Sequence, residues 1–213
     1  MANEYALLAD LKATLDLSGE TFADADLQLA LTAASRAIDN ICERRFWPDP
    51  DATSVRYYTP RRSSRLLEID DLIALTSFET DNDADGVFEF SWTVNTDFVL
   101  EPLNAPADGE PYTMVRVQPY GHYRLPGAYR GFTQRVTLPR TVKVTGQFGW
   151  QAVPDEIKQA TMILAPRLSR RSREAPFGVI GFAMEGGSSA AMIARQDPDV
   201  MMLIGPYVRV LVF

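Results

Sequence analysis

Four acidic side chains crowd into one short stretch of the sequence, "TDNDADGVFEF". Carboxylates at positions one, three, five and nine of a tight loop are hard oxygen ligands of the kind that Ca²⁺ prefers. An EF-hand is excluded, because the twelfth position is Trp92 instead of a glutamate and the flanking runs are typical of strands. The candidate ligands for calcium in a hairpin loop are Asp81, Asp83, Asp85 and Glu89.

The same stretch also has the composition of a plain turn. Asp and Asn side chains bond to their own backbone in turns, and Gly86 supplies a positive φ angle. An Asp-Gly pair between two runs of β-forming residues is a strong hairpin signal. Two interpretations therefore stay open, a turn without a ligand and a calcium loop. We expect no other cofactor.

The remaining residues capable of chemistry do not form a catalytic set. The single histidine, His122, lies in a stretch rich in Gly, Pro and aromatic residues, and no G-x-S-x-G elbow is present. Two acid pairs, Asp70 with Asp71 and Glu68 with Glu101, are available for hydrolysis. Adjacent strand residues point to opposite faces, however, so the first pair could not flank one bond. We predict no enzymatic activity; a hydrolase or carbohydrate-binding β domain on a helical base is the alternative.

The composition bounds the class of protein. The 213 residues are 46% hydrophobic and 23% charged, which indicates one folded domain or one domain with a large insertion. The net charge of −7 argues against a DNA-binding factor. A single cysteine, Cys42, allows no disulfide within the chain, and together with one histidine it cannot supply a zinc site. No run approaches the ~20 apolar residues of a membrane span, so no membrane partner is expected.

Hydrophobic periodicity predicts helices over Tyr5–Leu15, from Asp24 or Asp26 to about Arg45, and from Pro154 onward. Short β-rich runs separated by turns fill the region from 53 to 150. The glycines of "GQFGW" in this region either allow a close backbone approach or bend a strand. The predicted fold class is α+β, a small helical bundle base with a β-rich insertion (a sandwich or partly open barrel) and an extended C-terminal segment. The predicted boundaries are 1–50 for the N-terminal helices, 51–152 for the insertion, 153–173 for the third main helix and 174–213 for the C-terminal docking segment.

The end of the sequence, "DPDVMMLIGPYVRVLVF", is strongly apolar. A free tail of this kind would expose an apolar strand edge, which is prone to pair with other chains. We therefore expect it to dock, either on its own domain as an edge strand or on a neighbouring subunit by strand addition. The predicted interface comprises this run and the arginines that end the third helix: Arg167, Arg170, Arg171, Arg173, Met201, Met202, Leu203, Ile204, Tyr207, Val208, Val210, Leu211, Val212 and Phe213.

Several stretches, taken in order, resemble the head-to-tail connector (adaptor) proteins of long-tailed bacteriophages. The resemblance covers nearly the whole chain, and its specificity comes from the order of the stretches, above all "VTGQFGW" followed by "VP" and a helix. The matching stretches are "LLADLKATLDL", "ALTAASRAIDNICERRF", "YYTP", "LEIDDL", "DFVLEPLNA", "VKVTGQFGW", "VPDEIKQATMILAPRL" and "RQDPDVMMLIGPYVR".

The resemblance implies that the protein is a structural component of a virion. Such proteins form a homo-oligomeric ring, typically dodecameric, beneath the portal protein at the portal vertex. The ring lies in the neck, joins the DNA-filled head to the tail and extends the DNA channel, through which DNA passes without sequence-specific binding. The implied partners are the portal and the head-completion (stopper) protein. The implied locations are the virion and, during assembly, the host cytoplasm. The charges of the arginines from 167 to 173 have two interpretations: solvated cations at a helix end, or, as we favour, a cluster that meets an acidic partner surface and steers assembly.

Overall fold

The computed structural model describes residues 3–15, 24–61, 64–118, 139–174 and 198–209, and the side chains within these ranges except those of 171–174. The chain divides into two compact units: residues 1–45 with 153–213, here the helical unit, and residues 46–152, here the sheet unit. The predicted insertion, 51–152, falls within the sheet unit. The predicted α+β class is confirmed, because helices accompany an antiparallel sheet that does not close into a barrel.

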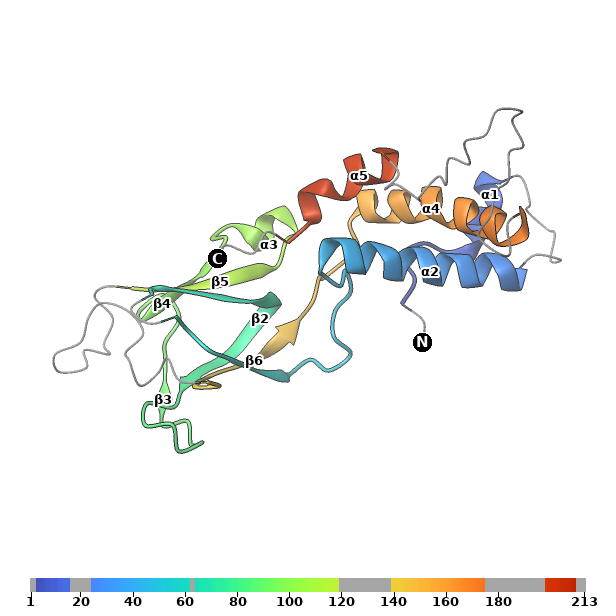
Figure 1. Ribbon diagram of the computed structural model, residues 1–213. Coiled ribbons are helices and arrows are strands. Elements are labelled where there is room, and N and C mark those ends of the chain that lie inside the picture. Colours follow the sequence, from blue (N-terminus) through green and yellow to red (C-terminus); the bar gives the residue numbers. More distant parts are fainter. Residues whose placement is uncertain (1–2, 16–23, 62–63, 119–138, 175–197, 210–213) are drawn as a thin grey trace, which may run out of the picture. The chain divides into compact units, whose positions relative to one another are not determined.

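Two antiparallel helices, α2 (Asp24–Cys42) and α4 (Asp155–Glu174), form the centre of the helical unit (Figure 1). Acidic residues in the first turn of each complement the helix dipole. The short helix α1 (Leu8–Thr14) inserts Leu11 into a cluster with apolar side chains of α2 and Ala165 of α4. Among the described helices, none is long and apolar enough to cross a membrane.

Helix α1 begins later than the predicted Tyr5, because the residues before it bond to α2 instead. The backbone N–H of Tyr5 donates to the Ser35 hydroxyl over 3.1 Å, and the Tyr5 hydroxyl donates to the Asp39 carboxylate. The Thr32 hydroxyl donates to the Glu4 carboxylate over 2.9 Å. Tertiary contacts therefore outweigh the local helical pattern at this end of the chain.

The sheet unit contains one antiparallel sheet of six strands in the order β1-β6-β2-β5-β4, with β3 paired to the far end of β2. The prediction offered a sandwich or a partly open barrel; the structure has a single sheet that does not close into a barrel. A short helix, α3 (Ala105–Asp108), follows β4. The strands are β1 (Ser54–Tyr58), β2 (Leu66–Thr80), β3 (Phe90–Ser91), β4 (Phe98–Glu101), β5 (Tyr112–Val117) and β6 (Val142–Phe148).

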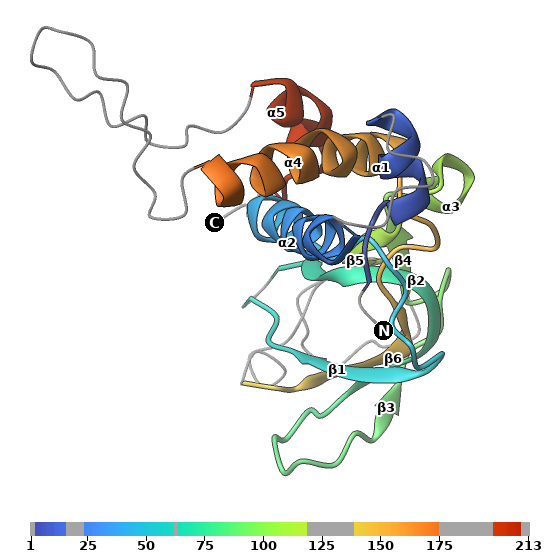
Figure 2. The same cartoon turned by 90° about the vertical axis from the view of Figure 1, so that its right-hand side faces the viewer.

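The long strand β2 shapes the sheet. Its first half pairs with β5 and its second half with β6, and the register shifts on both sides of Leu72. Such bulges bend a strand and increase its twist. The alternation of buried residues breaks at the same place, where Asp71 and Leu72 are both buried. The sheet consequently curls around a single core (Figure 2).

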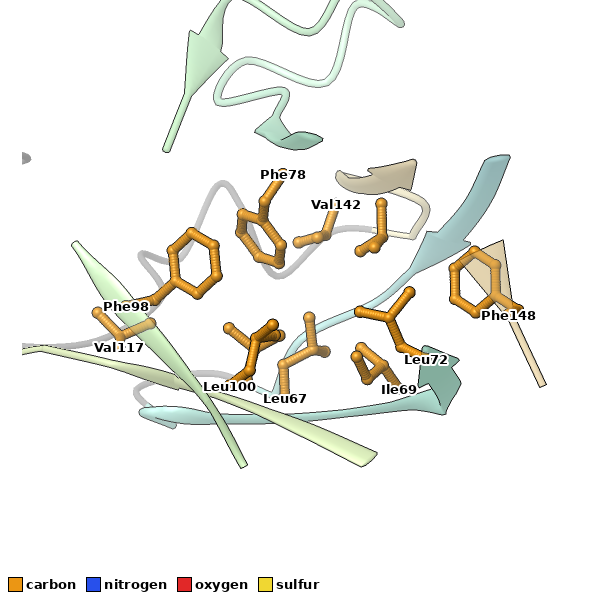
Figure 3. Packing of buried hydrophobic residues seen from close by; sticks show 11 residues of the cluster. Leu67, Ile69, Leu72, Phe78, Phe98, Leu100, Val117, Val142 and Phe148 are labelled. Carbon is orange, nitrogen blue, oxygen red and sulfur yellow. The ribbon is translucent and has the colours of Figure 1, made fainter. Parts of the chain in front are cut away.

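That core lies on the concave face of the sheet (Figure 3). Phe78 and Phe98 stack with ring centroids 4.8 Å apart, and Trp92 meets Phe78 edge-on at 5.7 Å. Burying one large apolar side chain contributes about 1.5–3 kcal/mol. The buried members are Leu67, Ile69, Leu72, Phe78, Phe98, Leu100, Val115, Val117, Val142, Val144 and Phe148.

Two glycines of the "GQFGW" motif allow close backbone contacts. A Cβ at Gly146 would stand 2.3 Å from the Ala74 carbonyl oxygen, and one at Gly149 would stand 2.1 Å from that of Trp47. Gly149 also has φ +101°, which favours glycine. Next to it, the Trp150 indole donates to the buried Asp71 carboxylate over 2.9 Å. The motif therefore joins the end of β6 both to β2 and to the start of the sheet unit.

We expect Gly146→Ala to lower the free energy of unfolding of the sheet unit. The added methyl would collide with backbone, and overpacking of this kind costs about 1–3 kcal/mol. Chemical denaturation measures the effect. Gly205→Ala is the matched control, because its Cβ would meet nothing within 4 Å. Equal denaturation midpoints for the two variants would contradict the role assigned to Gly146.

Candidate interaction surfaces

The described part of the C-terminal segment is helical, where an extended segment was predicted. It forms α5 (Pro198–Ile204) and a 3-10 turn, η1 (Gly205–Tyr207). Pro198 at the helix start and Asp199 in the first turn favour this helix. Val200 and Ile204, four positions apart, form its buried face. A short apolar run does not distinguish strand from helix by periodicity, which explains the wrong prediction.

This segment packs on its own helical unit. Helix α5 lies against α4, and the backbone N–H of Arg209 donates to the Cys42 carbonyl over 3.0 Å. The Tyr207 hydroxyl donates to the Glu156 carboxylate over 2.9 Å. Cys42 is itself buried, and burial raises the pKa of its thiol to about 11, so it is an inert core residue. The residues from 210 to 213 lie outside the described part of the chain.

The described apolar residues of the predicted interface consequently differ in burial. Ile204 is fully buried within its own unit, so its side chain contributes to that fold and offers no docking surface. Met202, by contrast, is 75% exposed. Met201, Leu203, Tyr207 and Val208 are half-buried.

The predicted arginine cluster occupies the second half of α4. The Arg167 guanidinium pairs with the Asp199 carboxylate over 3.4 Å and so links α4 to α5. Exposed pairs of this kind contribute about 0–1 kcal/mol. Arg170 is exposed, while the side chains of Arg171 and Arg173 lie outside the described residues. The docking role of these arginines stays a prediction.

Of the four carboxylates considered for hydrolysis, Glu68 is exposed, and the other three, Asp70, Asp71 and Glu101, have structural partners. Asp70 binds the Arg56 guanidinium over 2.9 Å and accepts the Tyr58 hydroxyl over 3.0 Å. Asp71 accepts the Trp150 indole, and Glu101 pairs with Arg116. Asp70 thus links β2 to β1, Asp71 links β2 to Trp150 just after β6, and Glu101 links β4 to β5. These contacts contribute to the packing of the sheet unit. His122 lies outside the described residues.

The acidic loop is held by the buried carboxylate of Asp81. Its oxygens accept the backbone N–H groups of Asp83 (3.2 Å), Ala84 (2.5 Å) and Gly86 (2.8 Å). Desolvation raises the pKa of Asp81, but these backbone hydrogen bonds together lower it below the ordinary value of 3.8. Ala84 and Gly86 both have positive φ. This arrangement is a turn stabilised by its own side chain.

The predicted calcium ligands do lie together. One carboxylate oxygen from each of Asp81, Asp83, Asp85 and Glu89 falls within 4.8 Å of the other three. The N–H groups bound to Asp81 nevertheless account for the loop without an ion. Calcium binding stays a prediction, which calorimetric titration of the protein with calcium chloride would test; absence of binding heat would end it.

We expect Asp81→Ala to lower the free energy of unfolding at neutral pH by about 1 kcal/mol or more, because several backbone N–H groups lose their acceptor. The contribution should be complete above the unfolded-state pKa of aspartate, about 3.9, and should disappear as the pH falls through the lowered folded-state pKa. Denaturation of parent and variant between pH 7 and pH 2 measures this. Curves that stay parallel over the whole range would contradict it.

For the C-terminal helix, we expect Ile204→Ala to destabilise the helical unit by about 2–5 kcal/mol through a buried cavity. Met202→Ala, on the exposed side of the same helix, should leave stability within about 0.5 kcal/mol of the parent. Thermal unfolding of the two variants compares them directly. A large loss for Met202→Ala would show that α5 packs differently.

No family model and no curated protein matches this chain. A solved structure does match in fold: a chain from the neck of an empty GTA particle, computed with C6 symmetry. The TM-score is 0.51 at 18% sequence identity, and the alignment covers 98% of this chain and 92% of the other. The likeness therefore extends over both units, and at this identity it concerns the fold.

Proposed function

We propose that this protein is a structural component of the neck of a phage-like particle. The observation that carries the proposal is the likeness in fold to a chain of the GTA particle neck, which spans nearly the full length of both chains. GTA denotes a gene transfer agent, a phage-like particle. The resemblance of the sequence to phage head-to-tail connectors supports the same role. The engagement of Asp70, Asp71 and Glu101 in structural pairs agrees with a function without catalysis.

In this role, copies of the chain form a closed ring. The neck of the similar particle was computed with C6 symmetry. A ring of twelve copies contains a sixfold axis, so the expected dodecamer is compatible with that symmetry. The net charge of −7 suits a ring through which DNA moves, because it opposes tight binding of phosphates.

The ring would lie between the portal and the stopper protein and extend the DNA channel. The exposed Met202 side chain and the arginines at the end of α4 are the proposed docking groups for these partners. Charges at such a surface mainly raise the rate and the selectivity of association. The protein would be present in the virion neck and, before assembly, in the host cytoplasm.

We expect the purified protein to form rings of six or twelve copies of the 23.7 kDa chain, either by itself at high concentration or after mixing with portal protein. Mass photometry and negative-stain electron microscopy would show them. A chain that stays monomeric in both conditions would contradict the proposal.

A further inference from the structure

An aromatic and aliphatic patch lies on the face of the sheet opposite the core. Along β1, Val55 and Tyr57 alternate with half-buried residues and are 46% and 43% exposed. The Tyr57 ring lies 5.7 Å from the ring of Phe88, whose neighbour Val87 is 58% exposed. The ring contact brings strand β1 and the loop between β2 and β3 together into one surface. These four residues, with the two cations described next, are called the outer-face patch.

Two cations lie over the aromatic rings of the outer-face patch. The Arg140 guanidinium is 4.8 Å from the centroid of the Tyr57 ring, and the Lys143 ammonium is 5.6 Å from that of Phe88. Lys143 is also paired with Glu79 over 2.7 Å. Arg140, in contrast, forms no ion pair with a carboxylate in the described part of the chain. The patch therefore presents apolar surface together with one cation that an incoming carboxylate can neutralise.

The charges around the outer-face patch define its partner. Asp83, Asp85 and Glu89 are exposed near Val87 and would repel a phosphate backbone, which in any case needs several cations for binding. They would also repel the carboxylates of a protein, so these are favoured only at the side of the patch where Arg140 lies. Aromatic residues and arginine are enriched in protein interfaces. The matching partner is a protein surface with an exposed apolar side chain and carboxylates on one side of it.

The turn after β4 carries a surface of this kind. Leu103 is 66% exposed, and Pro106 and Ala107 of the short helix α3 are exposed as well. Asp108 and Glu110 follow, both exposed, and neither forms an ion pair or a side-chain hydrogen bond within the residues that the structure describes. These five residues are called the α3 knob. Its apolar side chains and its two available carboxylates complement the outer-face patch in polarity and in charge.

The outer-face patch and the α3 knob lie at opposite ends of the sheet unit. Strand β1 is at one end of the strand order, and β4, which leads into α3, is at the other. Figure 1 and Figure 2 both show α3 and the loop that leads to β3 on opposite sides of the sheet. Neighbouring copies in a ring of twelve or six are rotated by about 30° or about 60°, so the two contact surfaces of each copy must face in nearly opposite directions. These two surfaces meet that requirement.

We propose that the outer-face patch of one copy docks on the α3 knob of the next copy. Leu103 would pack against Tyr57, while Asp108 and Glu110 would lie near Arg140 and neutralise it. This inference rests on the proposed ring and names two surfaces that join its copies.

A cycle of variants tests the charge pairing. Arg140→Asn removes the cation, and Asn tolerates the left-handed φ of 61° at this position. Asp108→Asn with Glu110→Gln, here the acid-neutral variant, removes the two carboxylates. Each change should raise the concentration needed for half-maximal ring assembly by about fivefold or more. Combining all three substitutions should add little to either effect, because the second change then has no partner charge to lose.

Matched controls separate docking from folding. Glu68→Gln neutralises another exposed carboxylate of the sheet unit and should leave assembly unchanged. Leu103→Thr should weaken assembly without any change of charge, whereas Leu66→Thr, at another exposed leucine of the same unit, should not. Circular dichroism and thermal unfolding verify that every variant is folded.

Each outcome has one meaning. Folded Arg140→Asn and acid-neutral variants that assemble like the parent, or effects that multiply in the combined variant, would overturn the docking while the ring proposal stands. A parent protein that never assembles, even with portal, would overturn both. Binding of a fluorescent single-stranded oligonucleotide that Arg140→Asn abolishes, with assembly unchanged, would assign the patch to nucleic acid and overturn the inference.

Discussion

The close approach of β6 to its neighbours is the constraint on which the sheet unit depends. At Gly146 and Gly149 the backbone comes so near to the carbonyls of Ala74 and Trp47 that a single methyl group would not fit. This contact lets the bent strand β2 curl around one core instead of forming a flat sheet. It also ties Trp150, at the end of the unit, to Trp47 at its start. An insertion between two helices must keep its ends together, and the hydrogen bond from the Trp150 N–H to the Trp47 carbonyl does so.

Carboxylates hold other parts of the sheet unit in place through hydrogen bonds. Asp71 accepts the Trp150 indole, and Asp81 accepts a set of backbone N–H groups. Hydrogen bonds of this kind offset part of the cost of burying a carboxylate. The acidic character of the chain thus has two roles, structural inside the sheet unit and electrostatic on its surface. Both roles are compatible with the proposed function.

The helices and most strands were predictable because their patterns are local. Strands β1 and β2 match the expected runs, since β-forming residues lie between clear turn signals. Strand β3 spans only Phe90–Ser91 and is shorter than the run "VFEFSWTV" suggested. Helix α5 was missed because its five apolar residues, 200–204, fit a strand as well as a helix. The secondary structure of such segments depends on their tertiary contacts as well as on their local sequence pattern.

The sequence by itself determined the α+β class, the positions of the main helices and the carboxylate spacing of the acidic loop. These depend on residue types and on spacing along the chain. Only the tertiary structure decided that α5 folds onto α4, that Asp81 binds backbone N–H groups, and that Tyr57, Phe88 and Arg140 share one face. Such contacts join residues far apart in the chain. Their free energy depends on burial and geometry, which no local pattern records.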